Sequence, residues 1–71
     1  MTLNNAEILK DYKVVSVATD DEELNSFLFS LGCFSGETIT IIRKTKSNLV
    51  IALKDGRYSI DTQLAKSIIV E

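Results

Sequence analysis

The sequence predicts a mostly β protein: a small antiparallel barrel of five to six short strands, with one amphipathic helix over about residues 20–31 and one helical turn over about residues 62–66. Two observations favour this class. Short runs of β-branched residues recur between polar turns along the 71 residues. The stretch from Thr19 to Arg43 also joins an amphipathic helix to such a run through a glycine stop and a tight turn. Closing a barrel removes the edges that so small a sheet would expose, and we expect one domain over residues 1–71.

Composition narrows the chemistry that the chain can perform. It has one cysteine and no histidine, which leaves neither an internal disulfide nor a Cys/His cluster for a structural metal. The core must therefore hold the fold alone, or with help from a partner or weak self-association. A lone thiol without a signal peptide predicts a cytoplasmic location, and no apolar run approaches the roughly 18 residues of a membrane-spanning helix. The formal charge of −2 argues weakly against a nucleic acid or an anionic membrane as the partner.

The first eighteen residues predict a short helical turn and then a strand. Asn4 or Asn5 is expected to cap the turn, because a short side-chain oxygen accepts from the free amides of a first turn. Its expected buried contacts are Leu3, Ile8 and Leu9. Residues 12–18 are rich in valine and form the first expected strand, with apolar residues on both faces as in a strongly bent barrel.

The helix over residues 20–31 carries a start signal, an apolar stripe and a stop signal. Thr19 and Glu22 have the spacing of a capping box, and the acidic run over residues 20–23 suits the positive end of the helix dipole. We read that run as a solvated cap and not as a metal site, because adjacent carboxylates on one turn diverge. Gly32 supplies the left-handed residue that ends a helix. The expected buried stripe at helical spacing is Leu24, Phe27, Leu28 and Leu31.

Phe29 lies off that stripe and admits two interpretations. We expect it to be buried under the N-terminal segment; the alternative is an exposed anchor for a partner, since exposed aromatic residues mark interfaces. Cys33 follows the helix, where the partial negative charge of a helix C-terminus disfavours a thiolate. We therefore expect Cys33 to be a small buried hydrophobe and not a nucleophile.

The second half of the chain predicts the remaining strands and turns. A tight turn at Ser35-Gly36 precedes a strand over residues 37–44, a polar loop over 45–48 and a strand over 49–54. Asp55-Gly56 is a strong signal for a two-residue type I′ hairpin turn into residues 57–60. Asp61 is expected to cap the turn at 62–66, with Leu64 and Ala65 facing inward, before a last strand over residues 67–70.

Enzyme chemistry is not expected of this chain. Without histidine there is no Ser-His or Cys-His pair, and no phosphate-binding glycine motif is present. The nucleic-acid alternative rests on basic residues at the two ends of the second hairpin, about 20 Å apart along a straight ladder. Stacking aromatics normally accompany such a surface, and Tyr58 alone is near. We read these residues as solvated hairpin ends; they are Arg43, Lys44 and Lys46 at one end, with Lys54 and Arg57 at the other.

Three segments together resemble the FeoA family, which accompanies ferrous-iron uptake: FLFSLGCFSGETITIIR, LVIALKDGRYSID and QLAKSIIV. The matching features are the Leu31-Gly32 pair at the end of the helix, Gly36 before a β-branched strand, Gly56, and Ala65 before an aliphatic last strand. The chain departs from the family pattern at Ser35, where proline usually stands, at Asp61, where arginine is frequent, and in a loop at 45–48 without proline. The glycine usually found before the first strand is also missing near Lys10-Asp11.

The resemblance implies an SH3-like barrel that acts as a cytoplasmic accessory protein and docks onto the FeoB permease, at its cytosolic GTPase region. Similar barrels form the C-terminal domain of iron-dependent repressors, where they mediate protein contacts. Transition-metal binding is a family-level association, yet a chain with no histidine and one cysteine is poorly equipped to hold ferrous iron, so we expect no cofactor and no metal ligand. The alternative function is an SH3-like RNA-binding or translation-associated barrel. The expected partner contacts are Phe29, Phe34 and Tyr58, with Arg43 at the rim.

Overall fold

The computed structural model describes residues 1–54 and 56–71 and is mostly β, as predicted. Five strands and one ten-residue helix account for most of it, with two shorter helical turns. In chain order the elements are η1 (Leu3–Asn5), β1 (Asp11–Val17), α1 (Glu22–Leu31), β2 (Thr38–Lys44), β3 (Asn48–Leu53), β4 (Gly56–Asp61), α2 (Thr62–Ala65) and β5 (Ile68–Val70).

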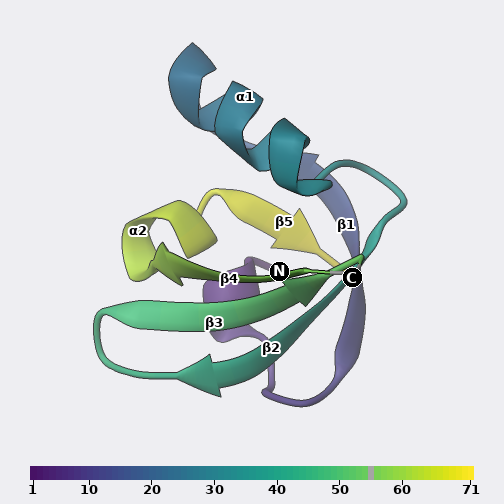
Figure 1. The fold of residues 1–71 in the computed structure, drawn as a ribbon, viewed down its shortest axis with the longest axis vertical. Coiled ribbons are helices and arrows are strands. Elements are labelled where there is room, and N and C mark those ends of the chain that lie inside the picture. Colours follow the sequence, from purple (N-terminus) through teal and green to yellow (C-terminus); the bar gives the residue numbers. More distant parts are fainter. Residues whose placement is uncertain (55) are drawn as a thin grey trace.

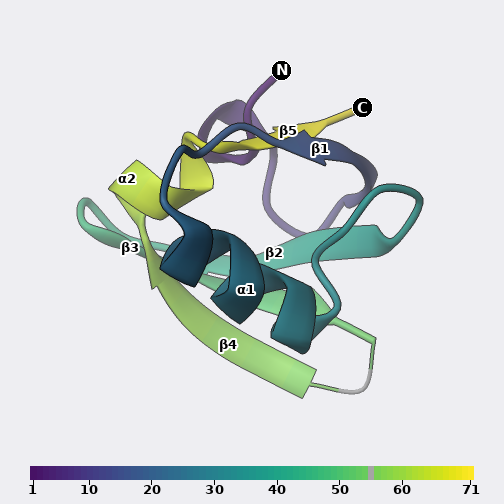
Figure 2. The same cartoon turned by 90° about the horizontal axis from the view of Figure 1, so that it is seen from above.

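The strands form one antiparallel sheet in the order β4-β3-β2-β1-β5 (Figures 1 and 2). The sheet curls, and α2 joins its two end strands, β4 and β5. Among residues 1–54 and 56–71 no backbone pairing links β4 to β5, so the ladder itself does not close as we had expected.

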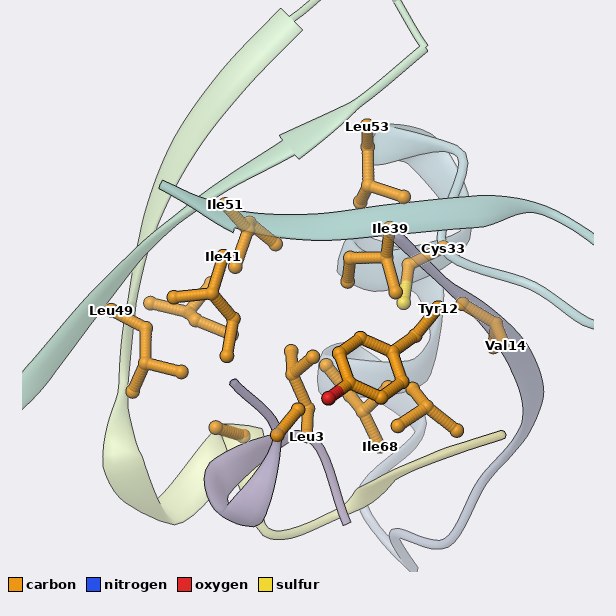
Figure 3. Packing of buried hydrophobic residues seen from close by; sticks show 14 of the residues in the cluster. Leu3, Tyr12, Val14, Cys33, Ile39, Ile41, Leu49, Ile51, Leu53 and Ile68 are labelled. Carbon is orange, nitrogen blue, oxygen red and sulfur yellow. The ribbon is translucent and has the colours of Figure 1, made fainter. Parts of the chain in front are cut away.

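The core is one cluster of apolar side chains inside the curled sheet (Figure 3). β-strand alternation supplies most of it, because every second residue of β2 and β3 points inward. The largest fully buried side chains are Leu3, Val14, Leu28, Cys33, Ile39, Ile41, Leu49, Ile51, Leu53, Ile68 and Val70. Leu64 and Ala65 of α2 are buried as predicted.

The segment before β1 differs from the prediction. Leu3 is buried, but Ile8 and Leu9 are 51% and 71% exposed, and no asparagine side chain caps η1. The loop is instead fixed by main-chain contacts: the Leu9 N–H donates to the Ile41 carbonyl at 2.7 Å. Leu9 has a φ of 59°, the left-handed conformation that glycine adopts without penalty. Leu9 therefore carries backbone strain close to Lys10-Asp11, where the usual family glycine is missing.

The start of α1 is also corrected. The predicted capping box does not form, because the helix begins at Glu22 and its N-cap is Asp21. The Asp21 carboxylate accepts from the N–H groups of Glu23 at 2.9 Å and Leu24 at 3.3 Å. Thr19 stabilises the preceding turn, where its hydroxyl accepts from the Asp21 N–H at 3.1 Å. At the other end Gly32 has a φ of 94° and ends the helix as predicted.

The apolar stripe of α1 is largely exposed, contrary to expectation. Of the ten residues of α1, all of them described, Leu28 alone is fully buried. Leu31 is half-buried, whereas Leu24 and Phe27 are 38% and 45% exposed. Figure 1 shows the reason: α1 stands over one end of the barrel with its first turn farthest from the strands. Leu28 is inserted in the core and Leu31 packs against its edge, whereas Leu24 and Phe27 remain exposed.

The turns follow the prediction at one place and shift at another. The Glu37 N–H donates to the Phe34 carbonyl at 3.1 Å, and Gly36 has a φ of 94°, so the Ser35-Gly36 turn forms as predicted. The β3–β4 turn begins earlier than predicted, because Gly56 belongs to β4 and pairs with Leu53. Asp55, the other residue of that predicted turn, lies outside the described residues. The register places two buried residues opposite each other, Leu49 and Ile60.

Candidate docking groove

An aromatic pair, with one ring exposed and the other partly buried, lies where α1 ends. The Phe29 and Phe34 rings are 4.9 Å apart between centroids and tilted by 34°. Phe29 is 65% exposed, so the expected burial under the N-terminal segment is wrong. The ring is exposed, as the alternative requires, and its role as an anchor for a partner stays a prediction. The pair forms because Gly32 reverses the chain after α1 and brings Phe34 back beside the last helical turn.

A hollow of about 410 Å³ opens beside this pair, and we call it the groove. One wall is the last turn of α1, and the other is the start of β4. Three of the four side chains that the sequence suggested for partner contact line it, namely Phe29, Phe34 and Tyr58. The remaining lining residues are Ser30, Leu31, Gly32, Lys54 and Gly56.

Lys54 is the groove residue that sequence reasoning missed. Its backbone has a φ of 51°, and its stem crosses Gly32, where an added Cβ would lie 3.1 Å from Lys54 Cδ and Cε. The ammonium lies 5.0 Å from the Phe34 ring centroid and 3.3 Å from Glu37 Oε1. A cation over an aromatic face is attractive by about 0.5–1 kcal/mol at exposed sites. These contacts hold a positive charge against the groove.

Tyr58 reaches the groove by lying across a glycine. A Cβ built on Gly56 would lie 2.6 Å from Tyr58 Cζ, closer than any real contact. Gly56 is therefore needed for close approach of the ring and not for a left-handed turn. The sequence carried this signal as a glycine two residues before a tyrosine, but strand pairing was needed to interpret it.

A second hollow of about 320 Å³ lies on the other side of the aromatic pair, between α1 and β1. Phe29 and Phe34 line both hollows, and Val15, Val17 and Cys33 supply further apolar lining. Burial raises the pKa of the Cys33 thiol from 9.0 to about 11, so the group is neutral at physiological pH. The predicted structural role of Cys33 agrees with its 2% exposure and with its sulfur pointing into the core in Figure 3.

Arg43 is not brought to the groove. It pairs with Val50 at one end of the β2–β3 ladder. Lys54 lies at the other end, directly after Leu53, which pairs with Ile39. The basic residues also fail to form a stripe, since the Lys44 ammonium donates to the Asn4 carbonyl and Lys54 pairs with Glu37. The geometry therefore does not favour the RNA-binding alternative.

Within residues 1–54 and 56–71, no three His, Cys, Asp or Glu side chains gather where they would hold a metal ion. In the same residues α1 is the longest helix, with ten residues, and no helix has the length and hydropathy of a membrane span.

The curled antiparallel sheet, the short helix joining its ends and the aromatic groove define a small SH3-like β protein. The chain belongs to the FeoA family, because the FeoA domain matches it over residues 1–71. This family is linked to ferrous iron transport. No curated protein matches the chain in sequence.

Solved structures give the same fold. FeoA of Stenotrophomonas maltophilia complexed with zinc, a prokaryotic SH3 domain protein, has a TM-score of 0.88 and 22% identity over 100% of this chain and 89% of that one. A FeoA-like protein of Clostridium acetobutylicum has a TM-score of 0.85 and 25% identity over 100% and 84%. A manganese-dependent transcriptional repressor with manganese bound reaches a TM-score of 0.89 at 14% identity, but this chain spans only 35% of it.

Proposed function

We propose that this chain is a cytoplasmic, non-catalytic accessory protein of ferrous iron uptake that docks onto the FeoB permease through the groove. The observation that carries the proposal is Phe29, a 65% exposed ring stacked on Phe34 at 4.9 Å. Folding gains little from an aromatic side chain left in water, whereas large aromatic anchors dominate the energetics of protein interfaces. Membership of the FeoA family supports the link to iron uptake and, through it, the choice of partner.

The groove has the features of a docking surface. Its aromatic residues come from α1, the loop after it and β4, and two glycines let Lys54 and Tyr58 approach closely. Such a surface is largely preformed, so a partner pays little to order it. The chemistry available to it is contact: the described lining residues include no nucleophile with an adjacent base.

The test is to measure binding of the purified chain to the cytosolic region of FeoB by isothermal titration calorimetry. Phe29→Ala is expected to weaken binding by about 30-fold, since truncating an interface anchor costs about 2 kcal/mol. Phe34→Ala should act in the same direction without unfolding the chain.

Phe27→Ala is the matched control, because Phe27 is also an exposed ring of α1, at 45%, but lines neither hollow. Its binding should equal that of the wild type. Absence of wild-type binding at high micromolar concentration would sink the proposal. Equal losses for Phe27→Ala and Phe29→Ala would move the contact away from the groove.

A further inference from the structure

We infer that the groove takes a segment that places a carboxylate beside an apolar side chain, and that Lys54 selects the carboxylate. The inference rests on the proposed function, in which the groove is the docking surface. Its basis is the cation that the fold holds against the groove wall, between the Phe34 ring and the Glu37 carboxylate.

The position of Lys54 is built by the backbone around it. Its left-handed conformation ends β3, and the absence of a side chain at Gly32 leaves the space that its stem occupies. The side chain remains 51% exposed. Its ammonium is therefore both positioned and reachable by a partner.

The charge of the groove is positive. Among the lining residues that the structure describes, Lys54 alone is charged. Its partner, Glu37, lies outside the lining and is 30% exposed. Ion pairs so near the surface contribute at most about 1 kcal/mol, so a second carboxylate can share or replace this one. The Glu37 contact shows that the Lys54 ammonium accepts a carboxylate neighbour, and a carboxylate of the partner would approach it from the groove side.

The distances limit how the occupant is arranged. The ammonium is 5.0 Å from the Phe34 centroid, which is 4.9 Å from the Phe29 centroid. The Lys54 ammonium and the Phe29 centroid are thus about 10 Å apart at most, which is roughly the length of three residues of extended chain. One segment with an acidic residue within three positions of an aliphatic or aromatic residue satisfies both.

A nucleic acid fits the groove less well than this peptide. Tracking a phosphate backbone takes several cations, and phosphate contacts are multiplied along a strand. The groove offers one cation, on a chain with a formal charge of −2. The occupant that the observations favour is an acidic–apolar protein segment.

Two variants with opposite expected effects test the inference. The probe is a phage-displayed library of random short peptides, selected on the immobilised chain, followed by fluorescence anisotropy with one enriched peptide. Wild type should enrich sequences with Asp or Glu within about three residues of Leu, Ile or Phe. Lys54→Met keeps the stem but removes the charge, and should weaken binding about tenfold by loss of a charge-assisted contact.

Glu37→Gln removes the internal competitor and should tighten binding about threefold, a gain that misfolding does not produce. Lys46→Met, a lysine in the exposed loop at the far end of the hairpin, is the matched control and should leave binding unchanged. Enrichment of neutral or basic peptides, no enrichment, an acidic preference that survives Lys54→Met, or tighter groove binding of a random RNA oligonucleotide would each overturn the inference.

The same variants separate this inference from the proposed function. If the cytosolic region of FeoB does not bind but acidic peptides are selected through Lys54, the partner is wrong and the inference stands. If FeoB binds through Phe29 with equal affinity for wild type, Lys54→Met and Glu37→Gln, the proposed function stands and the inference is wrong.

Discussion

Leu28→Ala is expected to destabilise the protein more than any other truncation on α1. Leu28 has 0% exposure and is the one side chain of α1 that is fully inserted in the core. Removing a buried leucine costs its transfer free energy and leaves a cavity, together about 3 kcal/mol. A chain of this length has a total stability of about 4–10 kcal/mol, so the loss is a large fraction of it.

The measurement is thermal and urea unfolding followed by circular dichroism. Leu28→Ala should lower the melting temperature by about 10–20 °C, while Leu24→Ala and Phe27→Ala, which are 38% and 45% exposed in the wild type, should cost about 1 kcal/mol each. Equal losses for the three variants would show that the whole stripe is buried. The described position of α1 over the end of the barrel would then be wrong.

Three further predictions concern single positions. Leu9→Gly should be more stable than Leu9→Ala by about 1 kcal/mol in urea unfolding, the reverse of the usual order, because φ is 59° there; the usual order would contradict the strain. Gly32→Ala should lower stability by about 1–2 kcal/mol in the same assay, since φ is 94° and the new methyl group meets the Lys54 stem; an unchanged midpoint would contradict this. The Cys33 thiol has a pKa raised by burial from 9.0 to about 11, so its contribution is complete below pH 9 and is lost as pH rises through about 11. Wild type should therefore lose up to about 2–3 kcal/mol more than Cys33→Ala over that range, and parallel pH profiles would refute it.

Local signals in the sequence predicted most elements of the fold. Glycine after an apolar stripe ends α1 at Leu31, and Gly36 forms the expected turn. Asp61 caps α2 as predicted, with its carboxylate accepting from the Leu64 N–H at 2.7 Å. Each of these signals acts within a few residues, so it survives without knowledge of the tertiary structure.

Burial could not be predicted from periodicity alone. A helical stripe identifies which side chains share a face, but not how much of that face another element covers. Leu24 and Phe27 share a face with Leu28 and remain exposed because α1 extends past the barrel. For the same reason, periodicity could not show whether another segment covers Phe29.

The groove needed long-range information. Its two aromatic residues near α1 were predicted as candidates, and Tyr58 joins them across the sheet. The sequence alone indicates only that Lys54 is a solvated residue at a hairpin end. Its contact with Gly32 joins residues 22 positions apart, and no local pattern predicts such a contact. Arg43 was placed at the rim from its position in a strand, and the ladder puts it at the opposite end. Contacts between distant segments decide both cases.

Docking of a partner at the groove can be observed residue by residue in a heteronuclear NMR titration. The ¹⁵N-labelled chain would be titrated with the unlabelled cytosolic region of FeoB and its amide shifts followed residue by residue. The account predicts the largest changes at Phe29, Phe34, Lys54 and Tyr58, with little change at the exposed Ile8 and Leu9 at the other end of the barrel. Shifts centred on Ile8, Leu9 and Arg43, or no shifts at all, would contradict it.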